Sequence, residues 1–493
     1  MTDQAHEVLY PLTGAQRNVW FHQKIDLTAT PYNAGQHILI EGKLDIQRLD
    51  FIQQKLIEDT EILGIRFVEL DHEPYQAFFA VSPSALSQWD LRKDLNPELA
   101  SEKLLSAQQH LHFDLEKGPL FRFGLIRIED ERWIWFWFYH HIIMDGAGVA
   151  SMLTRLVESY RSNTLVPSEV ALSWSQAVQE DNNYRQSPQW KDDSEYWRQT
   201  LDGILTPASL TSHPPTIGDL QTCETTSIEL ERIDFDRIAS WGKQHNLSLY
   251  PCFAAAVAAY LSRMTGEKDL CLGCPTDGRN RKTRATPGML TNILSLRIQI
   301  SSDENLLAIA RQFSIQLKQA LRHRQYPLGE IVKQRLTQNL SEPFSVLVNL
   351  ESFDHHADFG TAQGTLYTRA SEPVADLQLF IFDRRDNGSV ELRLAYNSRR
   401  YSAKQANTHL IKISQLIQLL ASSGEQSIAT LSILDHAQRA TVLKDSCGPL
   451  VDLSVQPQSL PALFAAQVAA SPDNPALIFE LSADSSSSMR YDE

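Results

Sequence analysis

Cysteine is scarce in this sequence, with only 5 among 493 residues. The five are odd in number and scattered, which excludes a disulfide framework. Only Cys271 and Cys274 have the spacing of a metal or redox motif, and neither a second cysteine pair nor a histidine cluster accompanies them. We therefore expect no metal site, and we interpret these two cysteines as small residues of a buried strand.

Long apolar runs and net positive charge are also absent. No uncharged stretch reaches the roughly eighteen apolar residues of a membrane span, and no basic-then-apolar export signal precedes Tyr10. The formal net charge of −15 disfavours binding to nucleic acid phosphates or to an anionic membrane surface. These absences predict a cytoplasmic protein whose partners are small molecules or other proteins.

The residues that are present indicate an α/β fold in two halves. A length of 493 residues suggests two or three packed units, and the hydrophobic share of 42% is that of a globular protein. In the first half, an aromatic strand at 133–139 is followed by a helix from Val149 to Tyr160. Aromatic and charged residues at 172–201 predict helices that bridge the halves. The second half repeats the alternation, with a helix at 251–264, a hairpin at 377–396 and a helix at 403–420.

The segment from His140 to Gly148 carries the strongest chemical signal. We predict a loop here, between the aromatic strand and the following helix. An imidazole at His141 is suited to general-base work on an attacking amine or hydroxyl, and Asp145 to an ion pair that fixes the loop. Gly146 and Gly148 would allow a tight turn and a close approach to substrate. His140 and His141 point to opposite sides of a strand, which disfavours a shared metal.

Other segments, in a fixed order, accompany this loop. The loop resembles the motif of two histidines, three residues, aspartate and glycine found in condensation domains of nonribosomal peptide synthetases, and the resemblance covers about residues 8–435. The segment 61–67 departs from the family pattern, because it lacks the arginine and histidine that usually open that block. The matching segments are Leu12–Trp20, Gly273–Arg279, Gly288–Asn292, His323–Glu330 and Glu342–Asn349.

The resemblance implies the architecture of the chain. Condensation domains are built from two lobes that resemble chloramphenicol acetyltransferase, arranged as a V-shaped pseudo-dimer with a tunnel between them. We expect the first lobe at residues 1–175, the second at 176–440 and a linker at 441–458. Residues 459–493 resemble the start of an adenylation domain, which would follow in the same chain.

The resemblance also implies an amide-forming acyltransferase. His141 would lie at mid-tunnel as base or positioning residue, supported by His140, Gly146 and a pair between Asp145 and Arg279. Gly148 and Asn292 are expected to line the tunnel. The domain itself would hold no cofactor or metal. The acceptor would be an aminoacyl group on the phosphopantetheine arm of a peptidyl carrier protein.

The donor is expected to arrive in trans. The family pattern begins within about ten residues of Met1, which leaves no room for a preceding carrier domain of roughly 80 residues. Features at 61–67, 288–295 and 371–377 are more typical of initiating modules, so the donor would be a fatty acyl-CoA, which we favour, or an acyl or aryl carrier protein. Alternatives are an internal peptide-elongating domain and an acyl-CoA-dependent acyltransferase of the same fold. Both histidines are present, which disfavours a heterocyclising domain, and the retained His141 and Asp145 disfavour a silent docking domain.

Overall fold

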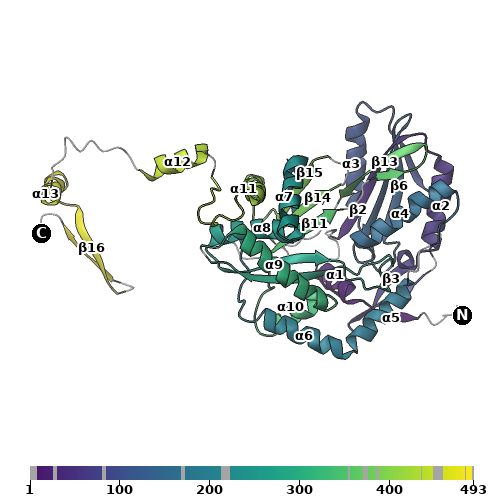
Figure 1. Ribbon diagram of the computed structural model, residues 1–493, viewed down its shortest axis with the longest axis horizontal. Helices are drawn as coiled ribbons and strands as arrows, with labels where there is room; N and C mark the ends of the chain where they lie inside the picture. The colour runs from purple at the N-terminus through teal and green to yellow at the C-terminus, as the bar shows by residue number, and fades with distance from the viewer. Residues whose placement is uncertain are drawn as a thin grey trace. The chain divides into compact units, whose positions relative to one another are not determined.

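Two six-stranded sheets with helices on their faces organise the computed structural model of the chain (Figure 1). Its residues divide into two compact units, Met1–Leu431 and Ser432–Glu493. The structure describes residues 8–25, 30, 32–79, 81, 85–167, 172–211, 223–301, 303–352, 356–369, 376–384, 388–434, 436–447, 459–482 and 485–490.

The first sheet has the order β12-β13-β2-β7-β6-β5. Its central strand β7 is the predicted aromatic strand, and it is buried on both faces. Strands β12 and β13 come from late in the chain, and β13 pairs with β2 along eight positions, from Ala362 opposite Gly42 to Arg369 opposite Gly35. The expected lobe boundary after residue 175 stays a prediction, and these two strands cross it. The bounds are β2 Asn33–Gly42, β5 Ser87–Asp90, β6 Phe121–Glu129, β7 Arg132–His140, β12 His356–Asp358 and β13 Ala362–Arg369.

Helices cover both faces of the first sheet. On one face, the indole nitrogen of Trp135 donates to Gln53 Oε1 of α2 (Ile46–Glu58) at 2.9 Å. On the other, Arg122, which lies opposite Phe138, donates to the carbonyl of Gln108 in α3 (Pro97–Gln109) at 3.1 Å. Trp135 and Phe138 are three residues apart on one strand, so their side chains point to opposite faces. Helix α4 (Gly146–Ser162) packs beside α2.

The second sheet has the order β10-β9-β11-β14-β15-β8. The predicted hairpin is confirmed as the antiparallel pair β14 and β15, although residues 385–387 of its turn lie outside the described residues. The helix predicted at 251–264 is confirmed as α8, which ends where Gly266 adopts a φ of +79°. The bounds are β8 Cys223–Leu230, β9 Asp269–Thr276, β10 Asn292–Gln299, β11 Val346–Ser352, β14 Leu377–Asp383, β15 Val390–Asn397, α7 Arg232–Gln244, α8 Leu249–Thr265, α9 Leu306–Ala320 and α11 Ala403–Ser423.

The elements between the two sheets bring distant segments together. The predicted bridging helices are confirmed as α5 (Trp174–Arg185) and α6 (Pro188–Thr200). A β-carbon on Gly14, the first residue of α1, would lie 2.3 Å from the ring of Pro327 just before α10, so these two segments touch. The remaining elements are β1 Leu9–Pro11, α1 Gly14–Ile25, the turns η1 Glu61–Gly64 and η3 Leu321–His323, β3 Ile65–Leu70, β4 Glu73–Phe78 and α10 Leu328–Leu336.

The second compact unit contains α12 (His436–Ser446), α13 (Leu460–Ala470) and a hairpin of β16 (Pro475–Ser482) with β17 (Ser485–Arg490). The expected linker at 441–458 overlaps α12, and its residues 448–458 lie outside the described residues. The adenylation start expected at 459–493 stays a prediction.

Candidate active site

The histidine loop begins where β7 ends and is held by backbone hydrogen bonds. The amide of His141 donates to the carbonyl of Tyr32 at 2.8 Å, and the amide of Met144 donates to the carbonyl of His141 at 3.2 Å. The main chain of His141 is therefore bonded to the residue just before β2 and to a residue of its own loop.

His140 is sealed inside the first lobe. Its side chain is 2% exposed; Nδ1 accepts from the amide of Ile142 at 3.2 Å, and Nε2 therefore donates to Gln23 Oε1 at 3.2 Å. Burial, helped by the neighbouring His141, lowers the pKa of His140 to about 3. His140 is therefore neutral near pH 7, and both of its nitrogens are engaged inside the protein.

His141 differs from its neighbour in accessibility, because it is only half-buried. An imidazole that keeps partial access at the end of a strand can exchange a proton with a bound group near neutral pH. The geometry is compatible with the expected base or positioning role, and the role itself stays a prediction.

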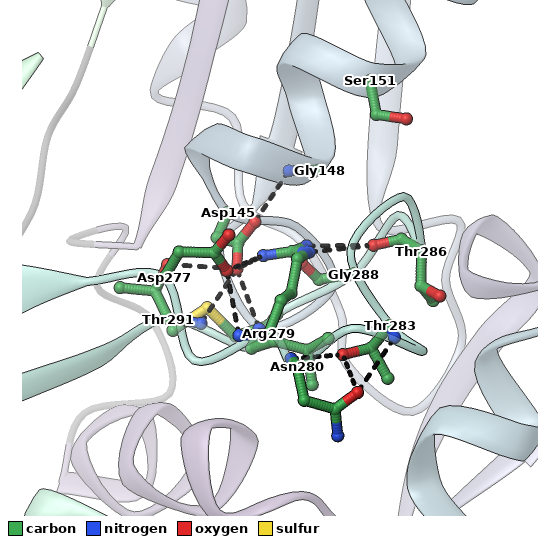
Figure 2. Close-up of polar contacts among 12 residues, drawn as sticks. Asp145, Gly148, Ser151, Asp277, Arg279, Asn280, Thr283, Thr286, Gly288 and Thr291 are labelled. Atoms are coloured by element: carbon green, nitrogen blue, oxygen red, sulfur yellow. Dashed lines mark hydrogen bonds and ion pairs between the residues drawn. The ribbon is translucent and has the colours of Figure 1, made fainter. Parts of the chain in front are cut away.

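Asp145 is the hub of the polar contacts in Figure 2. Its Oδ1 accepts from the amide of Gly148 at 2.8 Å, and its Oδ2 accepts from Arg279 at 2.8 Å. Oδ2 also accepts from the amides of Leu290 and Thr291, each at 2.9 Å, and from the Thr291 hydroxyl at 3.1 Å. Burial alone would raise the pKa of Asp145, but the charge of Arg279 and these hydrogen bonds hold it below its ordinary value. Asp145 is thus a buried carboxylate that joins α4 to the segment before β10.

Arg279 completes the pair and is equally enclosed. Its side chain is 1% exposed, and it donates to the carbonyls of Thr286 and Gly288 and to both Asp145 and Asp277. Burial opposes the charge of Arg279, yet the carboxylates of Asp145 and Asp277 raise its pKa above the ordinary value. The predicted ion pair between Asp145 and Arg279 is confirmed.

The predicted loop is too long, because α4 begins at Gly146 rather than at Val149. Asp145 caps this helix through the amide of Gly148, so one carboxylate both starts the helix and pairs with Arg279. Gly146 and Gly148, which were predicted to allow a tight turn, lie in the first turn of α4, and neither has a positive φ. Their close approach to substrate stays a prediction. A β-carbon on Gly148 would lie 2.6 Å from Met144 Sδ and 2.9 Å from the amide of Gly288, whereas one on Gly146 would meet no atom within 4 Å.

Asn292 and Gly148 occupy packed positions. The side-chain nitrogen of Asn292 donates to the carbonyls of Arg324 and Tyr326 at 2.8 and 2.7 Å. Its side-chain oxygen accepts from the backbone amide of Leu328 at 3.1 Å. Asn292 therefore ties the start of β10 to the start of α10. The tunnel-lining role expected for the two residues stays a prediction.

The two cysteines with motif spacing lie three positions apart on β9, so their side chains point to opposite faces. Burial raises the pKa of both thiols, that of Cys274 to about 12, which keeps them protonated at neutral pH. Within the described residues, no cluster of three or more His, Cys, Asp and Glu side chains could hold a metal ion, and no helix is long and apolar enough to cross a membrane.

Three residues behind the loop were not identified from sequence. Gln16 donates to the carbonyl of Ile142 at 3.3 Å, Gln76 bonds to Gln16, and the indole of Trp174 donates to Gln76 at 2.9 Å. Gln16 lies inside the quoted segment Leu12–Trp20, which could have identified it. Gln76 and Trp174 are single residues without a motif.

One protein-family model matches most of the chain. The model of the condensation domain family matches residues 6–443. The chain belongs to the condensation domain family. This condensation domain is therefore an amide-forming acyltransferase domain of nonribosomal peptide synthesis, with the two-lobe fold that resembles chloramphenicol acetyltransferase.

Curated relatives of the condensation domain are much longer proteins. The dimodular nonribosomal peptide synthase of Bacillus subtilis (strain 168) is 27% identical over 444 residues, which cover 89% of this chain and 18% of that protein. Enterobactin synthase component F of Escherichia coli O157:H7 is 26% identical over 486 residues, which cover 95% of this chain and 36% of that protein. The chain thus spans less than two fifths of either relative.

Solved condensation domains have the same fold. A variant of the starter condensation domain of rhizomide synthetase, in complex with C8-CoA and Leu-SNAC, matches with a TM-score of 0.80 and 25% identity, covering 87% of this chain and 98% of that one. The first condensation domain of the calcium-dependent antibiotic synthetase matches with a TM-score of 0.79 and 23% identity, covering 87% and 99%, and shows the fold alone.

Proposed function

We propose that this condensation domain joins an acyl group, supplied in trans as a thioester, to the amine of an aminoacyl group on a peptidyl carrier protein. The amine nitrogen attacks the thioester carbonyl, so a C–N bond forms and the C–S bond breaks. The nitrogen loses a proton, and the departing thiolate gains one. His141 accepts the amine proton or holds the amine in line, and Asp145 with Arg279 keeps the loop in place.

The observation that carries this proposal is the difference in exposure among the three ionisable side chains of the loop, since His140 and Asp145 are buried and His141 is half-buried. Both nitrogens of His140 are engaged inside the protein, and both oxygens of Asp145 are engaged by α4 and by the second half of the chain. His141 is the half-buried member of the set. An imidazole is also the side chain best suited to take a proton from an amine near pH 7.

For the donor we propose a fatty acyl-CoA. A relative of the same fold, the rhizomide synthetase starter domain, is described in complex with C8-CoA. In this chain, the turn after Arg279 carries the exposed residues Arg281 and Arg284, and the hydroxyl of Ser151 in α4 donates to the carbonyl of Ala285 at 3.3 Å.

Charge supports this donor class. Lys282 of the same turn pairs with Glu180 at 2.9 Å, whereas Arg281 and Arg284 have no ion-pair partner among the described residues. Figure 2 shows this turn, between Arg279 and Thr286, below Ser151 of α4. In a chain of net charge −15, two exposed arginines on the turn favour a phosphorylated ligand. Coenzyme A carries three phosphate groups, and a carrier-bound arm carries one.

The test mixes the protein with an aminoacyl carrier protein and three donors in separate reactions: medium-chain acyl-CoA, an aryl-loaded carrier and a peptidyl-loaded carrier. Intact-mass analysis of the acceptor carrier reads out the new amide. We expect product from acyl-CoA. Product only from the aryl carrier would overturn the CoA donor, and product only from the peptidyl carrier would show an elongating domain. Arg281→Gln with Arg284→Gln should raise KM for acyl-CoA, while Arg237→Gln, an exposed change on α7, should not.

A further inference from the structure

Four buried polar side chains form a hydrogen-bonded network that contacts the backbone of the histidine loop. Trp174 donates from its indole to Gln76 Oε1 at 2.9 Å, and Gln76 donates to Gln16 Oε1 at 3.0 Å and to the carbonyl of Pro11 at 2.8 Å. Thr13 donates through its amide to Gln16 at 3.0 Å and through its hydroxyl to the carbonyl of Met289 at 3.4 Å. None of the four is more than 2% exposed.

One end of the network contacts the main chain beside His141. Gln16 donates to the carbonyl of Ile142 at 3.3 Å, and the amide of Ile142 donates to His140 at 3.2 Å. Because the amide of His141 is bonded to Tyr32, the peptide groups on both sides of His141 are held. The network itself contacts the next carbonyl, that of Ile142, and so anchors the loop one residue after His141.

The other end reaches the opposing loop. Gly288 has a φ of +154°, and a β-carbon there would lie 2.0 Å from the ring of Trp174, so the indole packs directly on this backbone. The carbonyl of Gly288 accepts from Arg279 and from the amide of Asp145. The network thus spans from the backbone of the histidine loop to the backbone that receives Arg279.

We propose that Gln16, Gln76 and Trp174 are positioning residues for amide formation, which set the place of His141 relative to the segment 288–291. The inference rests on the proposed role of His141. Apolar side chains could fill this space at a lower desolvation cost, whereas buried hydrogen bonds define one arrangement of the backbone. A misplacement of about 1 Å at a reacting group is enough to slow a reaction roughly 10²-fold.

The chain contains a matched control. Gln53 accepts from the indole of Trp135 at 2.9 Å, in the same lobe, and both side chains are 2% exposed or less. Trp135 precedes His141 by six residues along the chain, which corresponds to roughly 20 Å of extended strand. Gln53→Leu and Gln76→Leu each leave one buried indole N–H without its acceptor, but only Gln76 belongs to the network.

The experiment first establishes amide formation by the unmodified protein; its absence with every donor would refute the proposed function, not this inference. With active protein, Gln76→Leu should lower kcat about 10²-fold. KM for donor and acceptor should stay within about two-fold, because the binding surfaces are untouched. Gln53→Leu should also lower the melting temperature, by less because the Gln53 side chain bonds to one partner among the described residues where that of Gln76 bonds to three, and it should keep kcat within about two-fold.

Equal kcat values for the two variants would overturn the positioning role, and so would a loss confined to KM. If either leucine variant is not folded by circular dichroism, the pair Trp174→Phe and Trp135→Phe decides. Each replaces an indole by a smaller phenyl ring and removes an N–H that donates to a glutamine. A kcat loss in Trp174→Phe alone supports the inference, and equal values overturn it.

Discussion

His140 and His141 differ in the exposure of their side chains. His140 is 2% exposed with both nitrogens engaged, and His141 is half-buried. His141→Ala should therefore slow amide formation by roughly 10²–10⁴-fold, the usual range for an acid-base residue. Single-turnover rates with a slow amine acceptor measure this loss. Near-unchanged rates would refute the base assignment, and a comparable loss with intact folding only in His140→Ala would reverse it.

His140 should appear in the pH dependence of stability. Its pKa falls from about 6.5 in the unfolded chain to about 3 in the folded protein, so the unfolded chain binds the proton more readily. Its contribution is full above about pH 6.5 and is lost as the pH falls toward 3, by up to about 1.4 kcal/mol per pH unit. Denaturant unfolding of His140→Asn should therefore show a shallower decline over that window. A slope identical to that of the unmodified protein would contradict this origin.

The ion pair of Asp145 and Arg279 is expected to stabilise the fold as well as the site. Both side chains are 1% exposed. Arg279→Ala therefore leaves Asp145 as a buried carboxylate without its cation, and Asp145→Ala leaves Arg279 with only the half-exposed Asp277 as an ion-pair partner among the described residues. Asp145→Ala or Arg279→Ala should cost about 3–5 kcal/mol of unfolding free energy. Urea titration measures the loss, and an unchanged transition midpoint for both variants would reject a stabilising pair.

The ion pair of Asp145 and Arg279 could be predicted from the sequence, whereas the hydrogen-bonded network of Gln76 and Trp174 could not. Asp145 and Arg279 belong to separate ordered motifs, so each could be named before any contact was known. Gln76 and Trp174 are isolated residues whose meaning depends on a contact between β4 and α5, 98 positions apart. No periodicity or spacing encodes such a long-range pairing.

The first residue of α4 depends on a contact that the local sequence does not indicate. The strand β7 was predictable because a continuous aromatic run fits a strand buried on both faces. The helix start was placed three residues late, since two glycines normally indicate a turn. Asp145 supplies the missing cap, and its second oxygen remains available to Arg279 and to the amides of Leu290 and Thr291.

The two glycines of α4 should respond oppositely to the same substitution. Gly148→Ala would press a methyl group against Met144 and the backbone of Gly288, so the melting temperature should fall. Gly146→Ala meets open space and gains helix propensity of up to about 1 kcal/mol, so the melting temperature should stay or rise. Thermal unfolding of both variants is the measurement. A lower melting temperature for Gly146→Ala than for Gly148→Ala would contradict this packing.

Strands β12 and β13, from late in the chain, make the first sheet depend on the second half of the sequence. Residues 356–369 complete the sheet that residues 33–140 begin, and the pairing joins segments more than 300 positions apart. Sequence reasoning recovered the two-half α/β pattern because it is repeated locally. The pairing of β13 with β2 was not predicted, since strands of ordinary composition carry no indication of a distant partner.

A fragment of residues 1–175 should therefore not fold as an independent domain. Without β13, the whole length of β2 becomes an open edge between β7 and solvent, with unpaired backbone groups from Gly35 to Gly42. We expect this fragment to aggregate or to unfold without a cooperative transition, whereas residues 1–431, which include every strand of both large sheets, should unfold cooperatively. Size-exclusion chromatography and circular dichroism of the two fragments compare them directly. A monomeric 1–175 fragment with a sharp thermal transition would show that the first lobe is stable without β12 and β13.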